Sequence, residues 1–151
     1  MTKLQWDQWS AIEVDDENLP LVKNFYKTCG ISFKYSVGER VFILRGKNAD
    51  NWSPILGAIR FQPEGGGFLL RSLCVDPAWR RNGLARQLLQ LALAQLSFPC
   101  CYSFALSHLR DLYASFNFVV IEISAAPPVI AKAYMTYRRN RRNLLLMKYG
   151  G

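Results

Sequence analysis

The chain has 151 residues, of which 50 % are hydrophobic and 20 % are charged, and its formal net charge at pH 7 is +8. These values exclude an intrinsically disordered chain, and the length is that of one folded domain with a substantial core. No apolar run approaches the roughly 20 residues that a membrane-spanning helix needs, and the first residues lack the apolar core of a signal peptide. We therefore expect a single domain, residues 1–151, that is cytoplasmic and has no membrane partner.

The surplus of lysine and arginine favours an anionic partner, such as a phosphorylated cofactor, an acidic small molecule or a nucleic acid. The densest basic cluster consists of Arg138, Arg139, Arg141 and Arg142. Charge runs of this kind are usually solvent-exposed faces, and no nucleic-acid recognition motif accompanies this one. Nucleic acid is therefore the less favoured partner.

Cysteine and histidine offer no metal site. The four cysteines, Cys29, Cys74, Cys100 and Cys101, do not have the spacing of metal ligands, and His108 is the one histidine in the sequence. We expect the cysteines to be reduced thiols in the core, where free cysteine behaves as a small apolar residue.

Apolar spacing and turn residues predict an alternation of strands and helices with three consecutive strands near the middle. Strands are predicted at residues 9–14, 41–44, 55–61, 68–75, 100–106, 118–123 and 144–149. Helices are predicted at residues 19–29, 85–96, 107–116 and 128–137. The turn-rich segment 45–51 predicts a hairpin between the second and third strands. This order favours a mixed sheet with helices on both faces.

The stretch 73–89 contains the strongest functional signal. Its apolar strand stops at Pro77, which cannot donate to a sheet ladder. The basic run Arg80-Arg81-Asn82-Gly83 comes next, and from Ala85 to Leu96 the apolar residues return with the spacing of one helix face. A helix N-terminus presents unpaired N–H groups and a partial positive charge, which suits a phosphate. Gly83 has no Cβ, so an anion can approach the backbone closely.

The same residues carry a family resemblance. Arg80-Arg81-Asn82-Gly83-Leu84-Ala85 matches the Arg/Gln-x-x-Gly-x-Gly/Ala signature of the GNAT superfamily of N-acetyltransferases, and Val75-Asp76-Pro77 matches the Val-x-Pro that precedes it. The order of predicted elements is similar to the GNAT fold over nearly the whole chain. The resemblance implies an α/β (α+β) fold with a mixed, mostly antiparallel central sheet. It also implies acetyl-CoA as the acetyl donor and direct attack of a primary amine, on a small molecule or a protein, on the thioester.

The resemblance further implies where the acetyl-CoA binds. The pyrophosphate would bind the loop formed by Arg80, Arg81, Asn82, Gly83, Leu84, Ala85 and Arg86. Arg81 and the N–H groups of Gly83–Ala85 are the first candidates for contact with the pyrophosphate. Arg86 ranks below them, because it also suits the solvent face of the helix. The pantetheine arm would lie along Leu73, Cys74 and Val75, where a backbone N–H can stabilise the developing oxyanion. A buried strand that binds no ligand would have the same composition as residues 73–75, so a purely structural role is compatible with these residues too.

Tyr113 is the candidate catalytic residue. Leu112-Tyr113-Ala114-Ser115-Phe116-Asn117-Phe118 resembles the family's Leu-Tyr-x-x-x-Gly-Phe segment, whose tyrosine commonly protonates the coenzyme A thiolate. Tyr113 also lies on an apolar helix face, so packing is the alternative. Asn117 replaces the glycine, and we expect it to adopt a left-handed conformation. The family's asparagine seven residues before the tyrosine is Leu106 here, and Ser107 is a candidate helix cap in its place.

The general base and the acetyl acceptor stay open. Glu13, Glu39 and Glu122 are candidate bases, a water chain is another, and His108 is more typical of a structural residue. Residues 133–148 are loosely similar to the end of the acetyltransferase domain of N-acetylglutamate synthase, which would imply an acidic amine that pairs with Arg71. A basic turn followed by an apolar closing strand is the favoured interpretation of that segment.

Three functions are therefore weighed. The first is an N-acetyltransferase, and the second is a non-catalytic acyl-CoA-binding regulatory module on the same fold. The third is an acetyltransferase whose acceptor is associated with nucleic acid, such as RNA or a ribosomal protein. Acyl groups other than acetyl, and a monomer or a homodimer, are all compatible with the sequence.

Overall fold

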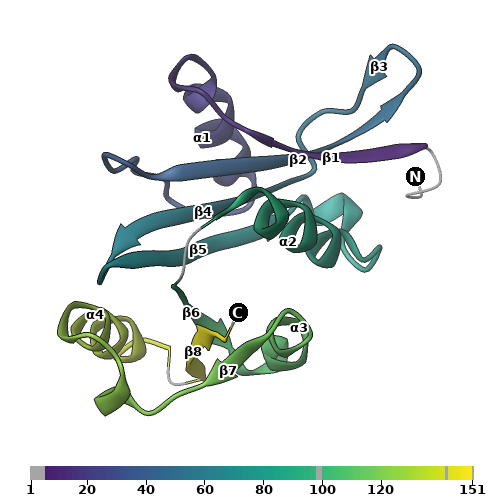
Figure 1. Cartoon of the computed structure of the whole chain (residues 1–151). Coiled ribbons are helices and arrows are strands. Elements are labelled where there is room, and N and C mark those ends of the chain that lie inside the picture. Colours follow the sequence, from purple (N-terminus) through teal and green to yellow (C-terminus); the bar gives the residue numbers. More distant parts are fainter. Residues whose placement is uncertain (1–5, 98–99, 142, 151) are drawn as a thin grey trace. The chain divides into compact units, whose positions relative to one another are not determined.

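The computed structural model describes residues 6–97, 100–141 and 143–150 (Figure 1). Its elements, in chain order, are β1 (Gln8–Glu13), η2 (Asp16–Asn18), α1 (Leu19–Thr28), β2 (Arg40–Asn48), β3 (Asn51–Trp52), β4 (Gly57–Glu64), β5 (Gly67–Val75), η3 (Pro77–Trp79), α2 (Leu84–Gln95), β6 (Cys101–Leu106), η4 (Ser107–Leu109), α3 (Arg110–Ala114), β7 (Phe118–Val120), η5 (Ile123–Ala125), α4 (Pro128–Arg138) and β8 (Leu144–Tyr149). None of the helices in these ranges is long and apolar enough to cross a membrane.

Within the described residues the strands form an eight-stranded sheet of order β1-β2-β4-β5-β6-β8-β7, with β3 paired to β2. The pairs β1–β2, β2–β3, β6–β8 and β7–β8 are antiparallel, whereas β5 and β6 are parallel. The expected mixed, mostly antiparallel sheet is confirmed. The chain divides into two compact units, one made of residues 1–60 and 72–96 and the other of residues 61–71 and 97–151.

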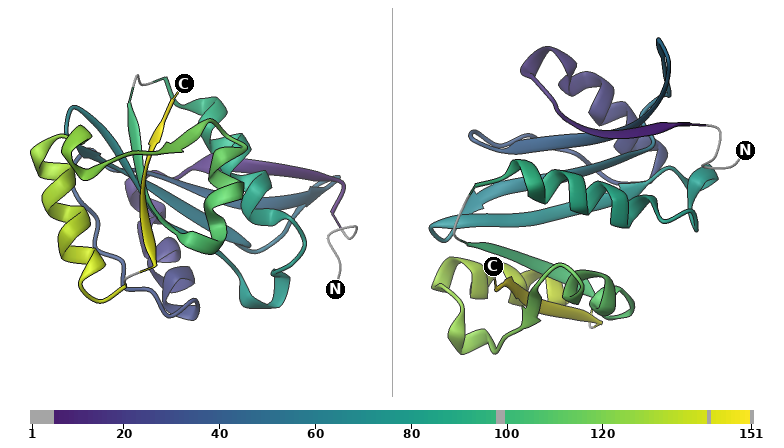
Figure 2. Two further views of the ribbon diagram at one scale, coloured as in Figure 1. Left: turned by 90° about the horizontal axis from the view of Figure 1, so that it is seen from below. Right: turned by 45° about the vertical axis from the view of Figure 1, so that its right-hand side comes forward.

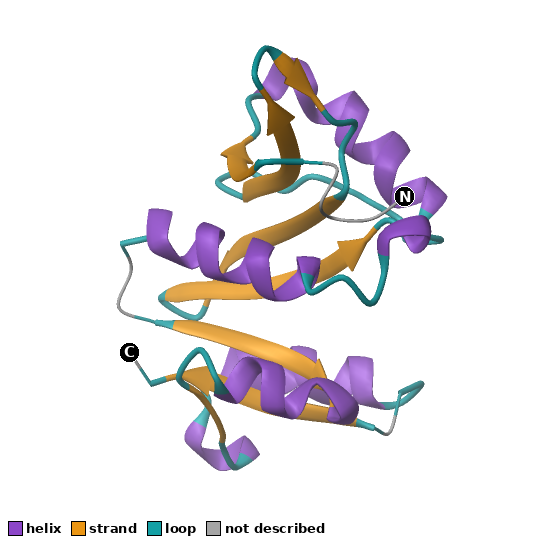
Figure 3. Cartoon of the chain, turned by 90° about the vertical axis from the view of Figure 1, so that its right-hand side faces the viewer, coloured by secondary structure: helices purple, strands orange, loops and turns teal. Residues whose placement is uncertain are grey.

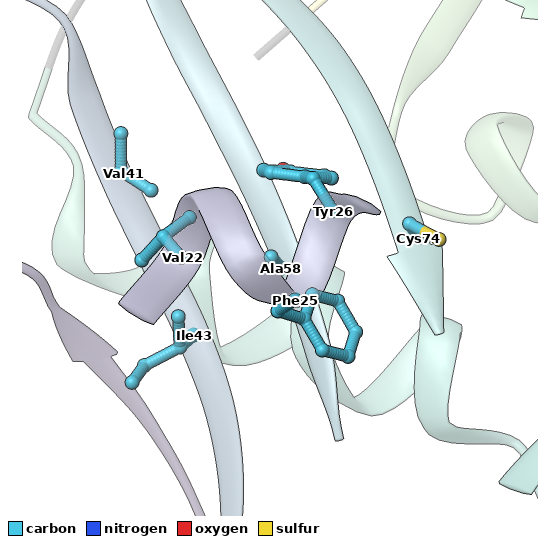
Figure 4. Packing of buried hydrophobic residues seen from close by; sticks show 7 residues of the cluster. All are labelled: Val22, Phe25, Tyr26, Val41, Ile43, Ala58 and Cys74. Atoms are coloured by element: carbon cyan, nitrogen blue, oxygen red, sulfur yellow. The ribbon is translucent and has the colours of Figure 1, made fainter. Parts of the chain in front are cut away.

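The first unit is a sheet with a helix on each face. Alternate residues of β2, Val41 and Ile43, pack with Val22, Phe25 and Tyr26 of α1, together with Ala58 and Cys74 (Figure 4). On the opposite face Gly57 lies against Leu88 of α2, where an added Cβ would be 3.2 Å from the Leu88 Cδ2 atom. The period-two alternation of the strands therefore places α1 and α2 on opposite faces.

The second unit repeats this arrangement. Ile130 and Tyr134 of α4 pack on a cluster that includes Leu69 and Tyr102, and the Tyr134 hydroxyl donates to the backbone oxygen of Leu144 over 2.7 Å. Figure 2 shows α3 on the other side of β6 and β8. Close backbone approach fixes Gly67, because an added Cβ would lie 2.4 Å from the Cys100 carbonyl oxygen.

Two of the predicted strands end at other residues than expected. Residues 45–48 were expected in a turn, but they extend β2, because β1 pairs along this strand from Gln8 opposite Lys47 to Glu13 opposite Phe42. The turn is confined to Ala49, whose φ is 48°, and Asp50, after which β3 pairs back to β2. The strand predicted at 118–123 stops at Val120, where a hydrogen bond from Ile121 N to Leu146 O leads into η5.

The expectations about cysteine and the basic cluster are met in part. All four cysteines are free thiols; Cys74 and Cys101 are buried, whereas Cys29 and Cys100 are half-buried. Arg138, Arg139 and Arg141 are exposed at the end of α4, as expected of a solvent-exposed basic face, and Arg142 lies outside the described residues.

A buried ion pair joins β4 to the segment before β2. Arg60 donates from Nε and Nη2 to the two carboxylate oxygens of Glu39, and the side chains are 5 % and 0 % exposed. The Arg60 Nη2 atom also donates to Lys34 O over 2.9 Å, and Ser36 N donates to the Glu39 carboxylate over 2.9 Å. These bonds fix the loop between α1 and β2. A second pair in the same unit, Arg40 with Glu13, has similar two-point geometry, but its side chains are 33 % and 42 % exposed.

We expect Arg60→Met to lower the free energy of unfolding by about 3–5 kcal/mol, because it leaves the Glu39 carboxylate buried without its cation. Arg40→Met removes an equivalent but exposed pair and should cost no more than about 1 kcal/mol. Urea denaturation of both variants measures the difference. Equal losses in the two variants would contradict the structural role given to the buried pair.

Candidate functional site

The loop after β5 is held in place by a short 3-10 turn (Figure 3). The Asp76 carboxylate accepts a hydrogen bond from Ala78 N over 2.8 Å, and the Asp76 carbonyl accepts one from Trp79 N over 2.8 Å. The Trp79 side chain is buried and packs edge-on against Trp9, with 6.5 Å between the ring centroids. The turn therefore anchors the loop before it reaches the basic residues.

Two left-handed residues shape the basic loop. Arg81 has a φ of 67° and Gly83 has a φ of 73°. Between them, the Asn82 side-chain amide donates to Trp79 O over 3.0 Å and to Arg80 O over 3.1 Å. Nothing lies within 4 Å of a Cβ added to Gly83, so its conformation and not its packing requires glycine, and the space beside it is open. Backbones with left-handed residues commonly form N–H concavities that bind anions.

The α2 N-terminus lies next to this loop. Gly83 is the N-cap residue and gives no side-chain hydrogen bond to the helix, and the first turn contains no acidic residue. Leu84 is buried and fixes the turn in the core, Ala85 is half-buried, and Arg86 is exposed. The first-turn N–H groups, the positive end of the helix dipole and a nearby arginine together suit an anion.

The three arginines of this region are not equivalent. Arg80, Arg81 and Arg86 are all exposed. The Arg80 Nε atom, however, donates to the Val75 carbonyl over 3.3 Å, so this side chain is turned back toward the end of β5. Arg81 is therefore the better placed of the first two to meet a ligand at the loop.

The strand before the loop changes its backbone conformation at Ser72, whose φ is 56°. The parallel pairing of β5 with β6 joins Phe68–Leu70 to Cys101–Ser103, whereas β5 itself continues to Val75. In this later part Leu73 is half-buried, and Cys74 and Val75 are buried. Ligand recognition along it would use backbone groups more than side chains.

Cys74 is chemically quiet. Burial raises the pKa of its thiol to about 12, with the Cys29 thiol adding to the effect and Arg80 opposing it. The sulfur atoms of Cys74 and Cys29 both lie near the Val75 carbonyl oxygen, at 3.8 Å and 4.0 Å.

Tyr113 belongs to the second unit, where α3 places it among buried residues. It is 4 % exposed, and its ring packs edge-on against Phe118 with 5.5 Å between the centroids. Burial raises the pKa of its hydroxyl to about 12, whereas a hydrogen bond with the Ser103 side chain lowers it. The phenol is therefore protonated throughout the neutral range and can donate a proton but not accept one.

The neighbours of Tyr113 test two further expectations. Asn117 has a φ of 68°, which confirms the left-handed conformation expected where the family has glycine. Its carbonyl accepts a hydrogen bond from Gly150 N over 2.6 Å, which ties α3 to the end of β8. The expectation that Ser107 caps the helix was wrong. A 3-10 turn begins at Ser107, so Leu106 is the N-cap residue of that turn. No side-chain hydrogen bond caps the turn.

The candidate bases lie in different surroundings. Arg40 holds the pKa of the Glu13 carboxyl below its usual range, chiefly through their hydrogen bonds. Glu13 is therefore stabilised in the charged form, which makes it a weak base. Glu39 is committed to the buried pair with Arg60. Glu122 and His108 are exposed, in the second unit.

Three residues of interest have contacts that no sequence motif marks. The Tyr26 hydroxyl donates to the Ser72 carbonyl over 2.8 Å. Arg71 donates to Gln62 Oε1 over 3.0 Å and to the Tyr137 hydroxyl, and its guanidinium carbon lies 4.7 Å from the centroid of the Tyr137 ring. The helical spacing of Tyr26 indicated only a core residue, and Ser72 had no signal at all.

Solved structures show the same fold. The ribosomal-protein-S18-alanine N-acetyltransferase of Escherichia coli aligns with a TM-score of 0.63 and 13 % identity over 93 % of this chain and 92 % of its own. Arabidopsis thaliana Naa50, solved with the bisubstrate analogue CoA-Ac-MVNAL, aligns with a TM-score of 0.57 and 16 % identity over 95 % and 99 %.

N-acetylglutamate synthase from Neisseria gonorrhoeae, solved with coenzyme A and N-acetyl-glutamate, aligns with a TM-score of 0.60 and 16 % identity. The match covers 93 % of this chain but only 34 % of the synthase, so the chain spans about a third of that protein's length. At these identities the likeness shows the fold alone. No curated protein matched the sequence.

The sequence itself gives the family. The family model described as the acetyltransferase (GNAT) domain matches residues 38–120, more than half of the chain. That range contains β2, β4 and β5, the basic loop and helix α2 that follow, and the segment with Tyr113 and Asn117. The chain therefore belongs to the GNAT family of acetyltransferases.

Proposed function

We propose that the protein is an acetyl-CoA-dependent N-acetyltransferase that acts on a primary amine. The observation that carries the proposal is the anion-binding geometry after β5, where the left-handed loop leads into a helix N-terminus without a side-chain cap. Two similar folds support the donor, because the Neisseria synthase was solved with coenzyme A and Naa50 with a CoA-peptide bisubstrate analogue. We also propose that the chain is a single acetyltransferase domain and that the protein is cytoplasmic.

The residues of the first unit fit coenzyme A as a ligand. We assign the pyrophosphate to the N–H groups of Gly83, Leu84 and Ala85 and to the Arg81 guanidinium, which can form forked bonds to phosphate oxygens. Arg86 adds positive charge from the first turn of α2, and Arg80 and Asn82 hold the shape of the loop. The backbone of Leu73, Cys74 and Val75 is assigned to the pantetheine arm, because β5 continues here beyond its pairing with β6.

The acetyl donor supplies the thioester carbonyl that the amine attacks. A backbone N–H on Leu73–Val75 stabilises the negative charge that develops on the carbonyl oxygen. The new C–N bond forms as the C–S bond breaks, and Tyr113 gives its proton to the departing sulfur. The amine proton leaves to water, because Glu13 and Glu39 are held in ion pairs.

Coenzyme A binding tests the loop assignment. We expect Arg81→Gln to raise the dissociation constant for coenzyme A roughly tenfold, since a charge-assisted bond to phosphate is worth about 1.5–3 kcal/mol. Arg139→Gln, which removes an arginine that is also exposed, after the end of α4, should change this dissociation constant less than about twofold. Isothermal titration calorimetry at fixed ionic strength measures both. A similar small loss in the two variants would refute the assignment.

Turnover tests the role of Tyr113. We expect Tyr113→Phe to lower kcat by about 10²-fold or more with little change in the dissociation constant for coenzyme A, because only the proton donor is removed. The pKa of about 12 keeps the phenol protonated, so the loss should be equal from about pH 6 to about pH 9. Release of free thiol from acetyl-CoA is the measurement. An unchanged kcat would show that Tyr113 only packs.

The runner-up function is a non-catalytic acyl-CoA-binding module, which is favoured because the candidate bases Glu13 and Glu39 are held in ion pairs with arginines. The two functions differ in turnover and share cofactor binding. Tight binding of acetyl-CoA without thiol release over a broad panel of amines would support the module, whereas thiol release that requires an amine would exclude it.

For the acceptor we propose an amine that carries an anionic group. Arg71 is half-buried on β5 immediately before Ser72, and it donates hydrogen bonds to Gln62 Oε1 and to the Tyr137 hydroxyl, which orient its guanidinium. A guanidinium suits the forked hydrogen bonds of a carboxylate, and the Neisseria synthase of similar fold was solved with N-acetyl-glutamate.

We expect Arg71→Gln to raise KM about tenfold for amines that bear a carboxylate, since it removes a charged hydrogen-bond donor. KM for matched amides, such as an amino acid amide beside the free amino acid, should change less than about twofold. Thiol release at varied acceptor concentration measures both series. Equal changes in the two series would argue against an anionic acceptor.

A further inference from the structure

The middle of β5 contains a backbone conformation that its residue does not favour. Ser72 has a φ of 56°, in the left-handed region where glycine, asparagine and aspartate are the usual residues. Residues in this region persist only when the surrounding structure holds them there. Something in the first unit must therefore stabilise the bend at Ser72.

The Tyr26 hydroxyl provides this stabilisation. It donates to the Ser72 carbonyl over 2.8 Å, across 46 residues of sequence. Tyr26 is fully buried on the face of α1 that covers the sheet, in the same cluster as Cys74 of β5 (Figure 4). Burial raises the pKa of this hydroxyl well above its ordinary value, so the oxygen keeps the proton that it donates.

The Tyr26 ring is itself held by a second ring. Phe33 packs on it with 5.5 Å between the centroids, and the Arg60 guanidinium carbon lies 4.6 Å from the centroid of the Phe33 ring. Arg60 in turn is held by Glu39 and by Lys34 O. A buried ion pair therefore fixes a stack of two rings, and the second ring places the hydroxyl that reaches β5.

The bend at Ser72 controls the next three residues of the strand. Leu73, Cys74 and Val75 come directly after Ser72, so its dihedral angles set the direction in which their N–H and C=O groups point. Under the proposed function these are the groups that bind the pantetheine arm. A side chain that holds Ser72 therefore acts on the acetyl donor without touching it.

We propose that Tyr26 is a positioning residue for the acetyl donor, because its hydrogen bond to the Ser72 carbonyl holds the left-handed bend that aims the backbone of Leu73–Val75. This inference rests on the proposed function for the ligand, but the contact that carries it lies wholly within the first unit. It assigns to Tyr26 a role distinct from filling the core.

Tyr134 offers a matched control for this role. It is also a buried tyrosine on a helix, and its hydroxyl donates to a strand carbonyl, Leu144 O, over 2.7 Å. Tyr134→Phe therefore removes the same kind of bond from a comparable environment in the second unit. Both variants should lower the urea midpoint by similar amounts, and any further effect of Tyr26→Phe then reports on position and not on stability.

The experiment compares Tyr26→Phe, Tyr134→Phe and the double variant Tyr26→Phe/Ser72→Gly with the wild type. We expect Tyr26→Phe to raise the dissociation constant for coenzyme A about fivefold or more, because it removes a hydrogen bond that orders the site. The dissociation constant of Tyr134→Phe should stay within about twofold of the wild-type value. Adding Ser72→Gly should recover most of the loss, because glycine adopts a positive φ without strain. In turnover, Tyr26→Phe should raise KM for acetyl-CoA more than it lowers kcat.

Hydrogen exchange of the free protein separates this inference from the proposed function. Peptides that cover residues 70–76 should exchange faster in Tyr26→Phe and unchanged in Tyr134→Phe. Faster exchange together with a wild type that does not bind coenzyme A would overturn the proposed ligand and with it the role of Tyr26 toward that ligand. If Tyr26→Phe binds coenzyme A as the wild type does, or if Tyr134→Phe weakens binding as much, the inference is wrong.

Discussion

The hydrogen bond between the Tyr26 hydroxyl and the Ser72 carbonyl lies where the main features of the first unit meet. On one side it is supported by two stacked rings and the buried pair of Arg60 with Glu39. On the other side it holds the point at which β5 turns toward the loop and α2. Unsatisfied buried polar groups are costly, so a side chain that satisfies the carbonyl also selects the backbone geometry around it. The basic loop is a local structure, but the strand that leads to it depends on contacts from distant parts of the sequence.

The positive charge of the chain is divided among different tasks. Arg81 and Arg86 lie exposed at the basic loop and the start of α2, where a helix dipole adds to their field. Arg60 is buried and structural, and Arg71 of β5 donates hydrogen bonds to Gln62 and to the Tyr137 hydroxyl. Arg138, Arg139 and Arg141 are exposed at the end of α4. Net charge alone therefore says little about binding, whereas the surroundings of each arginine say much more.

The parts of the fold and the site that were predictable are those encoded by neighbouring residues. The strand–loop–helix is marked within a few residues of sequence by Pro77, by Gly83 and by the helical spacing after Gly83. The left-handed conformation of Asn117 was predictable in the same way, from the residue type at that position. The extension of β2 to Asn48 was missed because its pairing with β1, a distant segment, outweighs the turn preference of its residues. Tyr26 and Ser72 were missed for the same reason, since a hydroxyl and a carbonyl 46 residues apart leave no pattern in the sequence. The Arg60–Glu39 ion pair was not predictable either, because the sequence alone does not distinguish a buried arginine from an exposed one.

Burial of Cys74 has a consequence for the proposed chemistry, because it keeps the thiol in its unreactive, protonated form. On the strand proposed for the pantetheine arm, a thiolate would compete with the amine for the acetyl group and leave the protein acylated. With its pKa raised to about 12, the Cys74 thiol is neutral at pH 7, and a neutral thiol is a poor nucleophile. Under the proposed placement of the pantetheine arm, the apolar packing of α1 on the sheet therefore does more than stabilise the fold, because it also keeps the Cys74 thiol unreactive toward the thioester.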